Sequence, residues 1–396
     1  MKSAAERTGA SAKTLRWRYH CPACGADYAI EPGRYLCGPC SSRNGPGKPL
    51  EGVLECAFEG QPERGGIPLP VEHRYFPHIP VGHTPLWEPA RLRNELGFPG
   101  LFLKDDTREP SGSFKDRASV LVAAFAREHG IGEIALASTG NAASSMACIG
   151  AAAGIKVKVF LPKSAPVAKR IQVLQYGADL VEIDGNYDLA FDTCVEYTTR
   201  TGVLSRNTAL NPLTIEGKKT ASYEIVHALD RLGQGRPDHV FVPTGDGVIL
   251  AGVYRGFEDL LATGEIAAMP TLWAVQAEGS SGIARALATG VFESRPSATI
   301  ADSISVDAPR NGPFALAKLR KHGGRAVTVG DAQILEAQLL ASSRAGLFVE
   351  PSSAAALAGF LKVRAEIGRD EKVVVLLTGS GLKDVRGAAR ALGVEA

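Results

Sequence analysis

The sequence predicts an α/β fold in which twisted, parallel-type sheets are flanked by helices, preceded by a small metal-binding module. Apolar segments of strand length alternate with amphipathic segments of helix length from about residue 81 onward, as is typical of parallel sheets covered on both faces. Two Cys-x-x-Cys pairs lie near the N-terminus. A chain of 396 residues is long for one hydrophobic core and suits two domains.

The expected strands and helices follow one another in regular order. The first strand is 101–106, and the helix after it, 118–130, ends at Gly130. Further strands are expected at 133–138, 156–162, 179–184, 239–245, 272–277 and 372–379, with helices at 141–154 and 168–177. We expect a flexible tail at 1–18, a metal-binding module at 19–45, a wrapping linker at 46–80 and a catalytic region at 81–392 that contains a smaller subdomain at about 130–210.

The composition excludes several classes of protein. A hydrophobic content of 45% with 22% charged residues is ordinary for a soluble globular protein. The net charge of +2 gives no basis for a nucleic-acid or membrane surface, and no apolar run reaches the roughly 20 residues that span a bilayer. The basic first 20 residues lack the apolar region of a secretory signal; they are compatible with a transit peptide, although a disordered tail is favoured.

Four of the seven cysteines cluster in two Cys-x-x-Cys pairs separated by 12 residues. Four thiolates at this spacing can close a tetrahedral zinc site, so we predict a structural zinc ribbon with a short hairpin around Tyr28 and Tyr35. A degraded ribbon and a redox pair in "CGPC" are the alternatives, and the lack of a surrounding βαβ unit disfavours the redox pair. The cluster and the odd total indicate a reducing, cytoplasmic location. The predicted ligands are Cys21, Cys24, Cys37 and Cys40, whereas Cys56, Cys148 and Cys194 are expected to be small buried residues.

Four loops after expected strands carry candidate chemistry, because ligands of open α/β sheets bind beyond the carboxyl ends of the strands. In "EPSGSFKDRAS", residues 109–119, Lys115 lies at a helix start, where the helix dipole disfavours its ammonium form. A lysine kept partly neutral is a nucleophile toward an aldehyde. From this loop alone, a surface lysine that lies over the helix is an equally good interpretation.

The other three loops offer anion cradles and hydroxyl groups. In "ASTGNAAS", 137–144, backbone N–H groups at a helix start can hold a carboxylate, although Asn141 can also be a simple N-cap. In "VPTGDGVILAG", 242–252, glycines and a helix start can hold a phosphate, although such turns are common. In "VVVLLTGSGLKD", 373–384, Thr378 and Ser380 can meet a ring nitrogen or can simply form a β-turn. An amine, two anion cradles and a neutral hydroxyl in one site indicate pyridoxal phosphate.

In this order and spacing, the loops resemble those of the fold-type II pyridoxal-phosphate enzymes, the tryptophan synthase β-like family. "SGSFKDR" is similar to the lysine motif of that family, "STGN" to its asparagine loop, "PTGDGVILAG" to its phosphate loop and "LTGSGLKD" to its ring-nitrogen strand. "NPLTIEGKKTASYEI", 211–225, is similar to a segment of threonine synthases and their paralogues. "GLFVEPSSAA", 346–355, resembles a stretch shared with threonine dehydratases. The resemblance covers about residues 80–392.

The resemblance implies a role for individual residues. Lys115 is expected to hold the cofactor covalently and to act as the catalytic proton carrier. For the cofactor, it implies that Phe114 flanks the ring, that Asn141 bonds its 3-oxygen, that Gly245, Asp246, Gly247 and Val248 bind its phosphate and that Thr378 meets its nitrogen. For the substrate, it implies that Ser138 and Thr139 bind the carboxylate, with Lys218 and Ser380 as further contacts.

Three positions depart from the family pattern. Asp246 stands where relatives have glycine or asparagine, so we expect its carboxylate to point away from the phosphate and to cap the following helix. Thr214 and Ser380 stand where threonine synthases have an arginine that clamps the substrate phosphate and a histidine, respectively. Lys218 is expected to replace the arginine as a point charge.

The function implied by the resemblance is the conversion of O-phosphohomoserine and water to threonine and phosphate. The alternatives are another elimination or replacement enzyme, such as a threonine dehydratase or a cysteate-synthase-like enzyme, and a non-catalytic zinc-ribbon interaction protein. The expected partner is a small amino-acid substrate, without nucleic acid or membrane. Family members are commonly dimers, so a homodimer is also expected.

Overall fold

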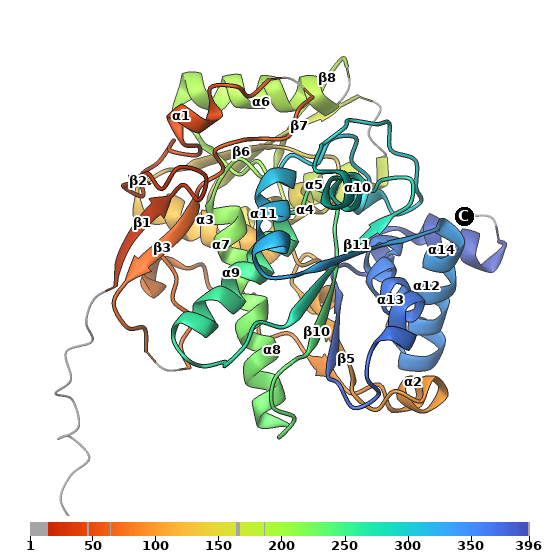
Figure 1. Cartoon of the computed structure of the whole chain (residues 1–396). Helices are drawn as coiled ribbons and strands as arrows, with labels where there is room; N and C mark the ends of the chain where they lie inside the picture. The colour runs from red at the N-terminus through yellow and green to blue at the C-terminus, as the bar shows by residue number, and fades with distance from the viewer. Residues whose placement is uncertain (1–14, 46, 64, 164–166, 186, 395–396) are drawn as a thin grey trace, which may run out of the picture.

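The computed structural model describes residues 15–45, 47–63, 65–163, 167–185 and 187–394 (Figure 1). These residues form three sheets with the strand orders β2-β1-β3, β12-β11-β10-β13-β5-β4 and β8-β7-β6-β9. The two larger sheets carry the helices, and the smallest lies at the left edge of Figure 1, beside α3 and α7. The predicted α/β class, with two sheets flanked by helices, is therefore confirmed.

The six-stranded sheet is parallel except at one edge. Its strands are β4 (Leu86–Trp87), β5 (Leu101–Asp105), β10 (His239–Pro243), β11 (Thr271–Ala277), β12 (Arg325–Val329) and β13 (Val373–Leu377), and only β4 is antiparallel to its neighbour. Every residue of β5 and of β13 is buried, because both faces of the sheet are covered. Alternate residues of one strand accordingly belong to different cores: Val375 packs with Phe360 on one side, and Val374 packs with Val242 on the other.

Helices from most of the chain cover this sheet. They are α2 (Ala90–Leu96), α8 (Thr220–Arg231), α9 (Val248–Ala262), α10 (Gly282–Thr289), α11 (Gly312–Lys321), α12 (Asp331–Ala345) and α13 (Pro351–Val363). Of the other helices, α3 (Asp116–Glu128) packs on the four-stranded sheet, α7 (Leu213–Glu216) on α3 and α9, and α14 (Val385–Leu392) on α12. In Figure 1, α2, α12, α13 and α14 gather on the right, and α12 packs on the other three.

The four-stranded sheet is built from residues within the range 130–210, where a smaller subdomain is expected from the sequence. Its strands are β6 (Glu133–Ala137), β7 (Lys156–Pro162), β8 (Asp179–Ile183) and β9 (Leu204–Ser205), all parallel, with helices α4 (Asn141–Ala153), α5 (Val167–Gln175) and α6 (Tyr187–Thr201). Helix α4 ends at Gly154, whose φ of 69° is a conformation that glycine adopts readily. The pairing of β6 with β9 brings residues after 204 beside the loop after β6.

The N-terminal module differs in three ways from the prediction. Strand β1 (Arg16–His20) includes residues 16–18, which we expected in the tail, whereas residues 1–14 lie outside the described part of the chain. Strand β2 (Asp27–Tyr28) pairs with β1 and not with the segment around Tyr35, so the predicted hairpin is wrong. Strand β3 (Glu55–Glu59) also pairs with β1, so the expected linker contributes a strand to this sheet. A short helix, α1 (Gly38–Ser41), follows Cys37.

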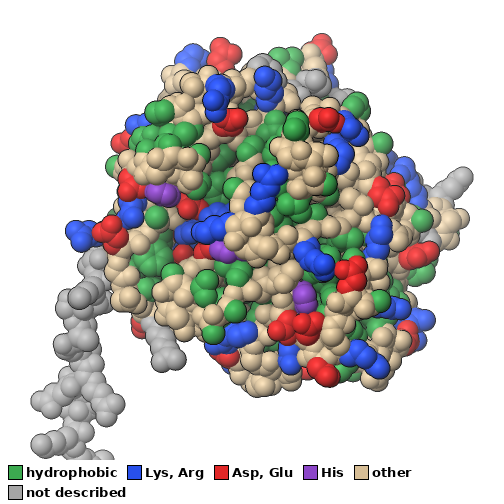
Figure 2. Space-filling model, viewed as in Figure 1, with side chains coloured by type: hydrophobic (Ala, Val, Ile, Leu, Met, Phe, Trp, Pro, Cys, Tyr) green, Lys and Arg blue, Asp and Glu red, His purple; other side chains and the backbone are tan. Residues whose placement is uncertain are grey.

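The surface carries mixed charge. On the face drawn in Figure 2, basic and acidic side chains are interspersed and form no extended region of one sign, in agreement with the net charge of +2. No helix among the described residues is long and apolar enough to span a membrane. The predicted burial of Cys56, Cys148 and Cys194 is confirmed.

Candidate active site

Two adjoining cavities lie at the carboxyl ends of the parallel strands. The first has a volume of about 390 Å³ and is lined by residues that include Lys115, Ser138, Thr139, Asn141 and Asp246, which follow β5, β6 and β10. The second has a volume of about 650 Å³ and shares several lining residues with the first, among them Asn141. The fold thus brings together five predicted site residues from three loops that are distant in sequence.

Lys115 immediately precedes α3 and has helical backbone angles, φ −65° and ψ −19°. Burial lowers the pKa of its amine to about 8, and the nearby Arg206 cation acts in the same direction. The carboxylates of Asp246 and Glu350 oppose part of this shift. A large fraction of the amine is therefore neutral near pH 8, and the neutral amine is the nucleophilic form.

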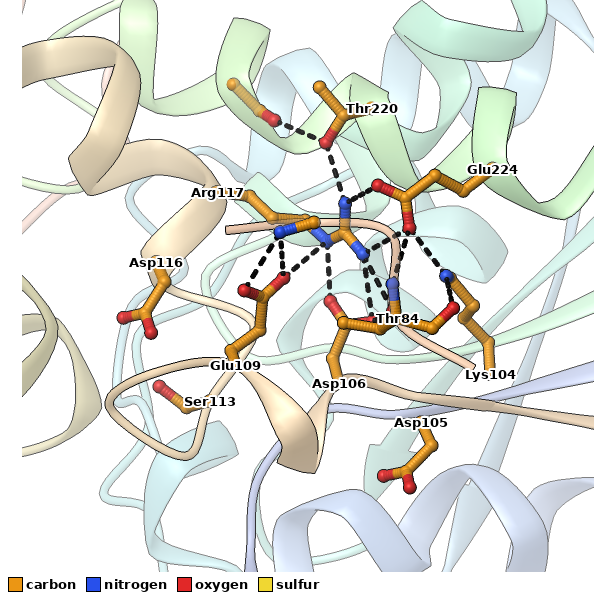
Figure 3. Close-up of polar contacts among 12 residues, drawn as sticks. Thr84, Lys104, Asp105, Asp106, Glu109, Ser113, Asp116, Arg117, Thr220 and Glu224 are labelled. Atoms are coloured by element: carbon orange, nitrogen blue, oxygen red, sulfur yellow. Dashed lines mark hydrogen bonds and ion pairs between the residues drawn. The ribbon is translucent and has the colours of Figure 1, made fainter. Parts of the chain in front are cut away.

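Arg117 anchors the start of this helix in a buried ionic network (Figure 3). Its guanidinium donates from Nε to Asp106 and from Nη1 to Glu224, both at 2.6 Å. Lys104 donates to the other carboxylate oxygen of Glu224, also at 2.6 Å. Because the partners come from β5, the turn after it and α8, tertiary contacts fix the position of Lys115. The network was not predicted from the sequence, although charges at 104–106 next to an apolar strand were a signal for it.

Asn141 is the first residue of α4, and its side chain is held by a carboxylate. Its Nδ2 donates to Oε1 and Oε2 of Glu350 at 3.0 and 3.1 Å, and to Ser303 Oγ at 3.2 Å. The residue that precedes the helix is Gly140, and no side chain caps it, so the N-cap interpretation of Asn141 is wrong. Glu350 is only 4% exposed and lines the second cavity. Its motif, "GLFVEPSSAA", was recognised in the sequence, but no role was predicted for Glu350.

The glycine loop lies between β10 and α9, as expected. Gly247 has φ 86°, and a Cβ there would lie 2.7 Å from the Cβ of Ala315, so only glycine fits. The first N–H groups of α9 have no acceptor within the helix, which makes this end suitable for an anion. The predicted helix cap is wrong, because Asp246 lines the first cavity and its Oδ1 accepts a hydrogen bond from the Arg310 backbone N–H at 3.1 Å.

Lys218 packs against α9, where a Cβ on Gly252 would lie 2.5 Å from the Cβ of Lys218, and it lines neither of the two cavities. Its side chain is fully buried, and its Nζ donates to the backbone oxygen of Thr214. Burial, assisted by the nearby Lys115 and Arg206, holds the pKa of Lys218 well below its usual range. The side chain therefore belongs to the charged surroundings of Lys115, and a direct substrate contact requires it to turn.

Of three further predicted residues, Phe114, Thr378 and Ser380, only Ser380 lines one of the two cavities. The ring of Phe114 is fully buried in the core of the large sheet and lines neither cavity, so the structure does not bring it to the expected place. Thr378 lies beside it, because the Phe114 N–H donates to the Thr378 carbonyl at 2.9 Å. The Thr378 hydroxyl is 3.3 Å from that of Ser353. Ser380 lines the second cavity and accepts from the Leu382 N–H at 3.3 Å.

The family is decided by a comparison of the whole chain. Residues 79–379 match the family described as "Pyridoxal-phosphate dependent enzyme". The chain belongs to this family. It is 36% identical over 335 residues to the threonine synthase of Methanocaldococcus jannaschii, a match that covers 80% of this chain and 82% of the relative. It is 34% identical over 388 residues to the threonine synthase of Methanosarcina acetivorans, a match that covers 92% of each.

Solved structures of related enzymes have the same fold. A threonine deaminase from T.th. has a TM-score of 0.65 and is 27% identical, and the match covers 76% of this chain and 92% of that one. Maize serine racemase, at 23% identity, has a TM-score of 0.66, and the match covers 79% and 92%, respectively. The second likeness concerns the fold alone.

The cavity residues fit the cofactor of this family. A pyridoxal phosphate needs a nucleophilic amine for its aldehyde and hydrogen-bond donors for its phosphate. Lys115 supplies a cavity amine with a lowered pKa. Asp246, which lines the same cavity, is followed directly by Gly247 and the start of α9, so the free N–H groups of that helix end lie next to the cavity. Acidic and basic side chains and the carboxamide of Asn141 also line this cavity, so its wall is polar.

The four clustered cysteines fit a tetrahedral metal ion. Their Sγ atoms all lie within 4.8 Å of one another, with Cys21 to Cys40 at 3.8 Å and Cys24 to Cys37 at 3.6 Å. Zinc–sulfur bonds of about 2.3 Å in a tetrahedron place the sulfur atoms about 3.8 Å apart. The thiol set therefore suits zinc, and no other cluster of this kind occurs among the described residues.

Proposed function

We propose that this pyridoxal-phosphate-dependent lyase is a threonine synthase, which converts O-phosphohomoserine and water to threonine and phosphate. The observation that carries the proposal is the cavity amine of Lys115, with its pKa of about 8, in the same cavity as Ser138 and Thr139, which lie just before α4. Relatives named threonine synthase, 34–36% identical over most of their length, support the choice of substrate. The non-catalytic alternative is not proposed, because the family lysine and the cavity are both present.

Each residue at the site has a defined task in this proposal. When bound, pyridoxal phosphate supplies an aldehyde that joins amino groups and a ring that withdraws electrons from the α-carbon of the substrate. Lys115 would hold the cofactor through Nζ, and its amine, when free, would take the proton from the α-carbon of the substrate. Ser138, Thr139 and the start of α4 bind the substrate carboxylate.

The remaining residues hold and orient the cofactor. The loop at Gly245–Gly247 and Val248, the first residue of α9, would bind its phosphate, and Asn141, held by Glu350, would bond its 3-oxygen. Thr378 offers its nitrogen a neutral hydroxyl, which favours elimination and replacement over transamination because it does not hold the ring protonated. Lys218 and Ser380 serve as further substrate contacts, Lys218 after it turns toward the first cavity.

A threonine dehydratase is the second candidate, and the carboxylate of Asp246 favours it. Asp246 lines the cavity of Lys115, and a carboxylate there would repel the phosphate of a phosphorylated substrate. Thr214 places a neutral side chain where a phosphate-clamping arginine is expected. The chain is also 27% identical to a threonine deaminase of known structure. A dehydratase substrate carries no phosphate and avoids this repulsion.

The two candidates differ in their products. Purified protein loaded with pyridoxal phosphate is incubated separately with O-phosphohomoserine, threonine and O-phosphoserine. A threonine synthase releases phosphate and threonine in equal amounts from the first substrate. Release of 2-oxobutyrate from threonine, without turnover of O-phosphohomoserine, contradicts the proposal in favour of the dehydratase, and turnover of O-phosphoserine with sulfite favours the cysteate-synthase-like enzyme.

Three further features belong to this proposal. The cluster of four cysteines binds zinc in a structural role, because a closed four-thiolate shell leaves no position for a substrate. The free thiols suit a reducing, cytoplasmic location. A homodimer is the oligomeric state that we propose, and size-exclusion chromatography with light scattering tests it.

A further inference from the structure

The segment that follows the ribbon reaches the candidate active site. Gly47 lines the same cavity as Lys115 and Asp246. Three residues later, the Leu50 N–H donates to the Arg310 carbonyl at 2.7 Å, and the Arg310 N–H in turn donates to Asp246 Oδ1 at 3.1 Å. One stretch of backbone therefore links the N-terminal module to the carboxylate beside the glycine loop.

The same segment packs against the start of α9. Leu50 and Val53 are 8% and 3% exposed and form one apolar cluster with Val248, the first residue of α9, and with Ala251 and Phe314. Removing apolar surface from water stabilises this contact roughly in proportion to its area. Residues outside the family match at 79–379 therefore pack against the helix end that we assign to the cofactor phosphate.

The cysteine cluster sets the position of this segment. The Cys37 N–H donates to the Gly52 carbonyl at 2.8 Å, and Leu36 pairs with Val53 in an isolated bridge. A Cβ on Gly52 would lie 3.1 Å from the Cβ of Cys40. The segment at 50–53 therefore packs directly against the turn between Cys37 and Cys40. A change in the conformation of this turn, the knuckle, must move the segment.

A second contact leads from the same module to the substrate side of the cavity. The Tyr35 hydroxyl, two residues before Cys37, accepts a hydrogen bond from the Ser205 N–H at 2.7 Å. Ser205 ends β9, and Asn207 accepts from the Ala137 N–H at 2.7 Å. Ala137 precedes the loop that carries Ser138. The contact through Leu50 and the contact through Tyr35 both start beside the Cys37–Cys40 pair and lead to residues that line the first cavity, Asp246 and Ala137.

We propose that metal binding at the four cysteines positions the active site: the occupied knuckle holds Leu50 and Tyr35 as positioning residues, and these keep the start of α9 and the loop at 137–141 in their binding-competent places. The ribbon then acts through a contiguous chain of packed side chains and hydrogen bonds. The inference rests on the proposed cofactor site and goes beyond it, because it makes cofactor affinity dependent on a metal that touches neither cofactor nor substrate.

The direct test measures cofactor affinity with and without the metal. Apoprotein is prepared with Zn²⁺ bound and after chelation, and the dissociation constant of pyridoxal phosphate is determined from its absorbance titration. We expect binding to weaken by about tenfold without Zn²⁺, which corresponds to about 1.4 kcal/mol. Hydrogen exchange should quicken in the peptides that contain Leu50, Ser205 and Val248. Equal dissociation constants in the two forms, or no binding of Zn²⁺ at all, overturn the proposal.

Substitutions separate positioning from folding. With Zn²⁺ bound, Leu50→Ala and Tyr35→Phe should each weaken cofactor binding several-fold. Ile367→Ala is the matched control: Ile367 is 6% exposed, lies before β13 at the opposite end of the sheet, and should leave the cofactor affinity unchanged. In Leu50→Ala, removal of Zn²⁺ should have a much smaller effect than in the wild type, because the linking contact is already lost.

The outcomes also separate this inference from the proposed function. If chelation unfolds the whole protein, as circular dichroism would reveal, the two substituted proteins with Zn²⁺ bound decide, and wild-type affinity in both overturns the inference. A protein that loses cofactor affinity without Zn²⁺ but makes no threonine supports the coupling and contradicts the threonine synthase proposal. A threonine-forming enzyme with metal-independent cofactor affinity gives the reverse result.

Discussion

The side-chain amide of Asn141 donates to both carboxylate oxygens of Glu350, at 3.0 and 3.1 Å, across 209 residues of sequence. This contact joins α4, which packs with the four-stranded sheet, to the start of α13, which packs with the six-stranded sheet, at the border of the two cavities. A charged acceptor strengthens a hydrogen bond, so the orientation of Asn141 is tightly fixed. The residue proposed to bond the cofactor therefore depends on a carboxylate that lies at the start of a helix on the other sheet.

Glu350→Gln tests this dependence. Glutamine has one acceptor oxygen and an amide nitrogen that faces the donor of Asn141, so Asn141 loses its fixed orientation. We expect kcat/KM to fall by about tenfold, equivalent to about 1.4 kcal/mol, with weaker cofactor binding in an absorbance titration. Glu366→Gln, which removes an exposed ion pair with Arg325, should leave both quantities unchanged. A wild-type kcat/KM in Glu350→Gln contradicts the assignment.

The lowered pKa of Lys115 predicts how fast the apoenzyme captures its cofactor at each pH. The neutral fraction of the amine grows as the pH rises toward the folded-state pKa of about 8 and is nearly complete above it. The capture rate, followed by stopped-flow absorbance, should rise by about tenfold per pH unit between pH 6 and 7 and level off above about pH 8. A rate that keeps rising to the ordinary lysine pKa of 10.5 would show that burial does not act on this amine.

Arg117→Met should destabilise the protein strongly. It removes the guanidinium between Asp106 and Glu224 and leaves buried carboxylates without their main partner, which costs about 3–5 kcal/mol. Urea unfolding of the apoprotein measures the loss. Arg91→Met, which breaks an exposed pair with Glu95, should change the free energy of unfolding by less than about 0.5 kcal/mol. Equal effects of the two substitutions would refute the anchoring role of the network.

Gly247→Ala and Gly233→Ala form a matched pair. Both glycines have positive φ, 86° and 67°, so alanine strains the backbone at either position by about 1–2 kcal/mol. Only at Gly247 would the added Cβ also meet a neighbour, Ala315, at 2.7 Å; at Gly233 nothing lies within 4 Å. We expect cofactor affinity to fall only in Gly247→Ala. A comparable fall in Gly233→Ala would mean that general instability, and not the phosphate cradle, is responsible.

Long apolar segments made most of the fold predictable. Strands such as β7, β10 and β13 are largely apolar runs of five to seven residues, and glycines mark the ends of several helices. Strands β2, β4 and β9 have two residues each, too few for any periodicity. Strands β4 and β9 were missed, and β2 was expected in a hairpin with the segment around Tyr35 but pairs with β1. Strand β3 lies in a region rich in glycine and proline, where the sequence favours a linker.

The parts of the candidate site that lie within one short sequence motif were predictable. The loop that carries Lys115 and the loop at 244–248 show their residues within one short motif. Asn141 and Arg117 are each held by a carboxylate more than 100 residues away in the sequence, so no local sequence pattern predicts these contacts. Asp246 shows the same limit. Its position in the sequence suits a helix cap, but in the structure its carboxylate accepts a hydrogen bond from the Arg310 backbone N–H.

The central claim is that Lys115 carries the cofactor, and borohydride trapping tests it most directly. Reduction of the protein loaded with pyridoxal phosphate fixes the cofactor to the amine that holds it, and peptide mass spectrometry locates the adduct. We expect a single modified peptide that contains Lys115, and none in Lys115→Ala. An adduct on Lys218 or on a surface lysine of the wild-type protein, with Lys115 unmodified, would contradict the claim.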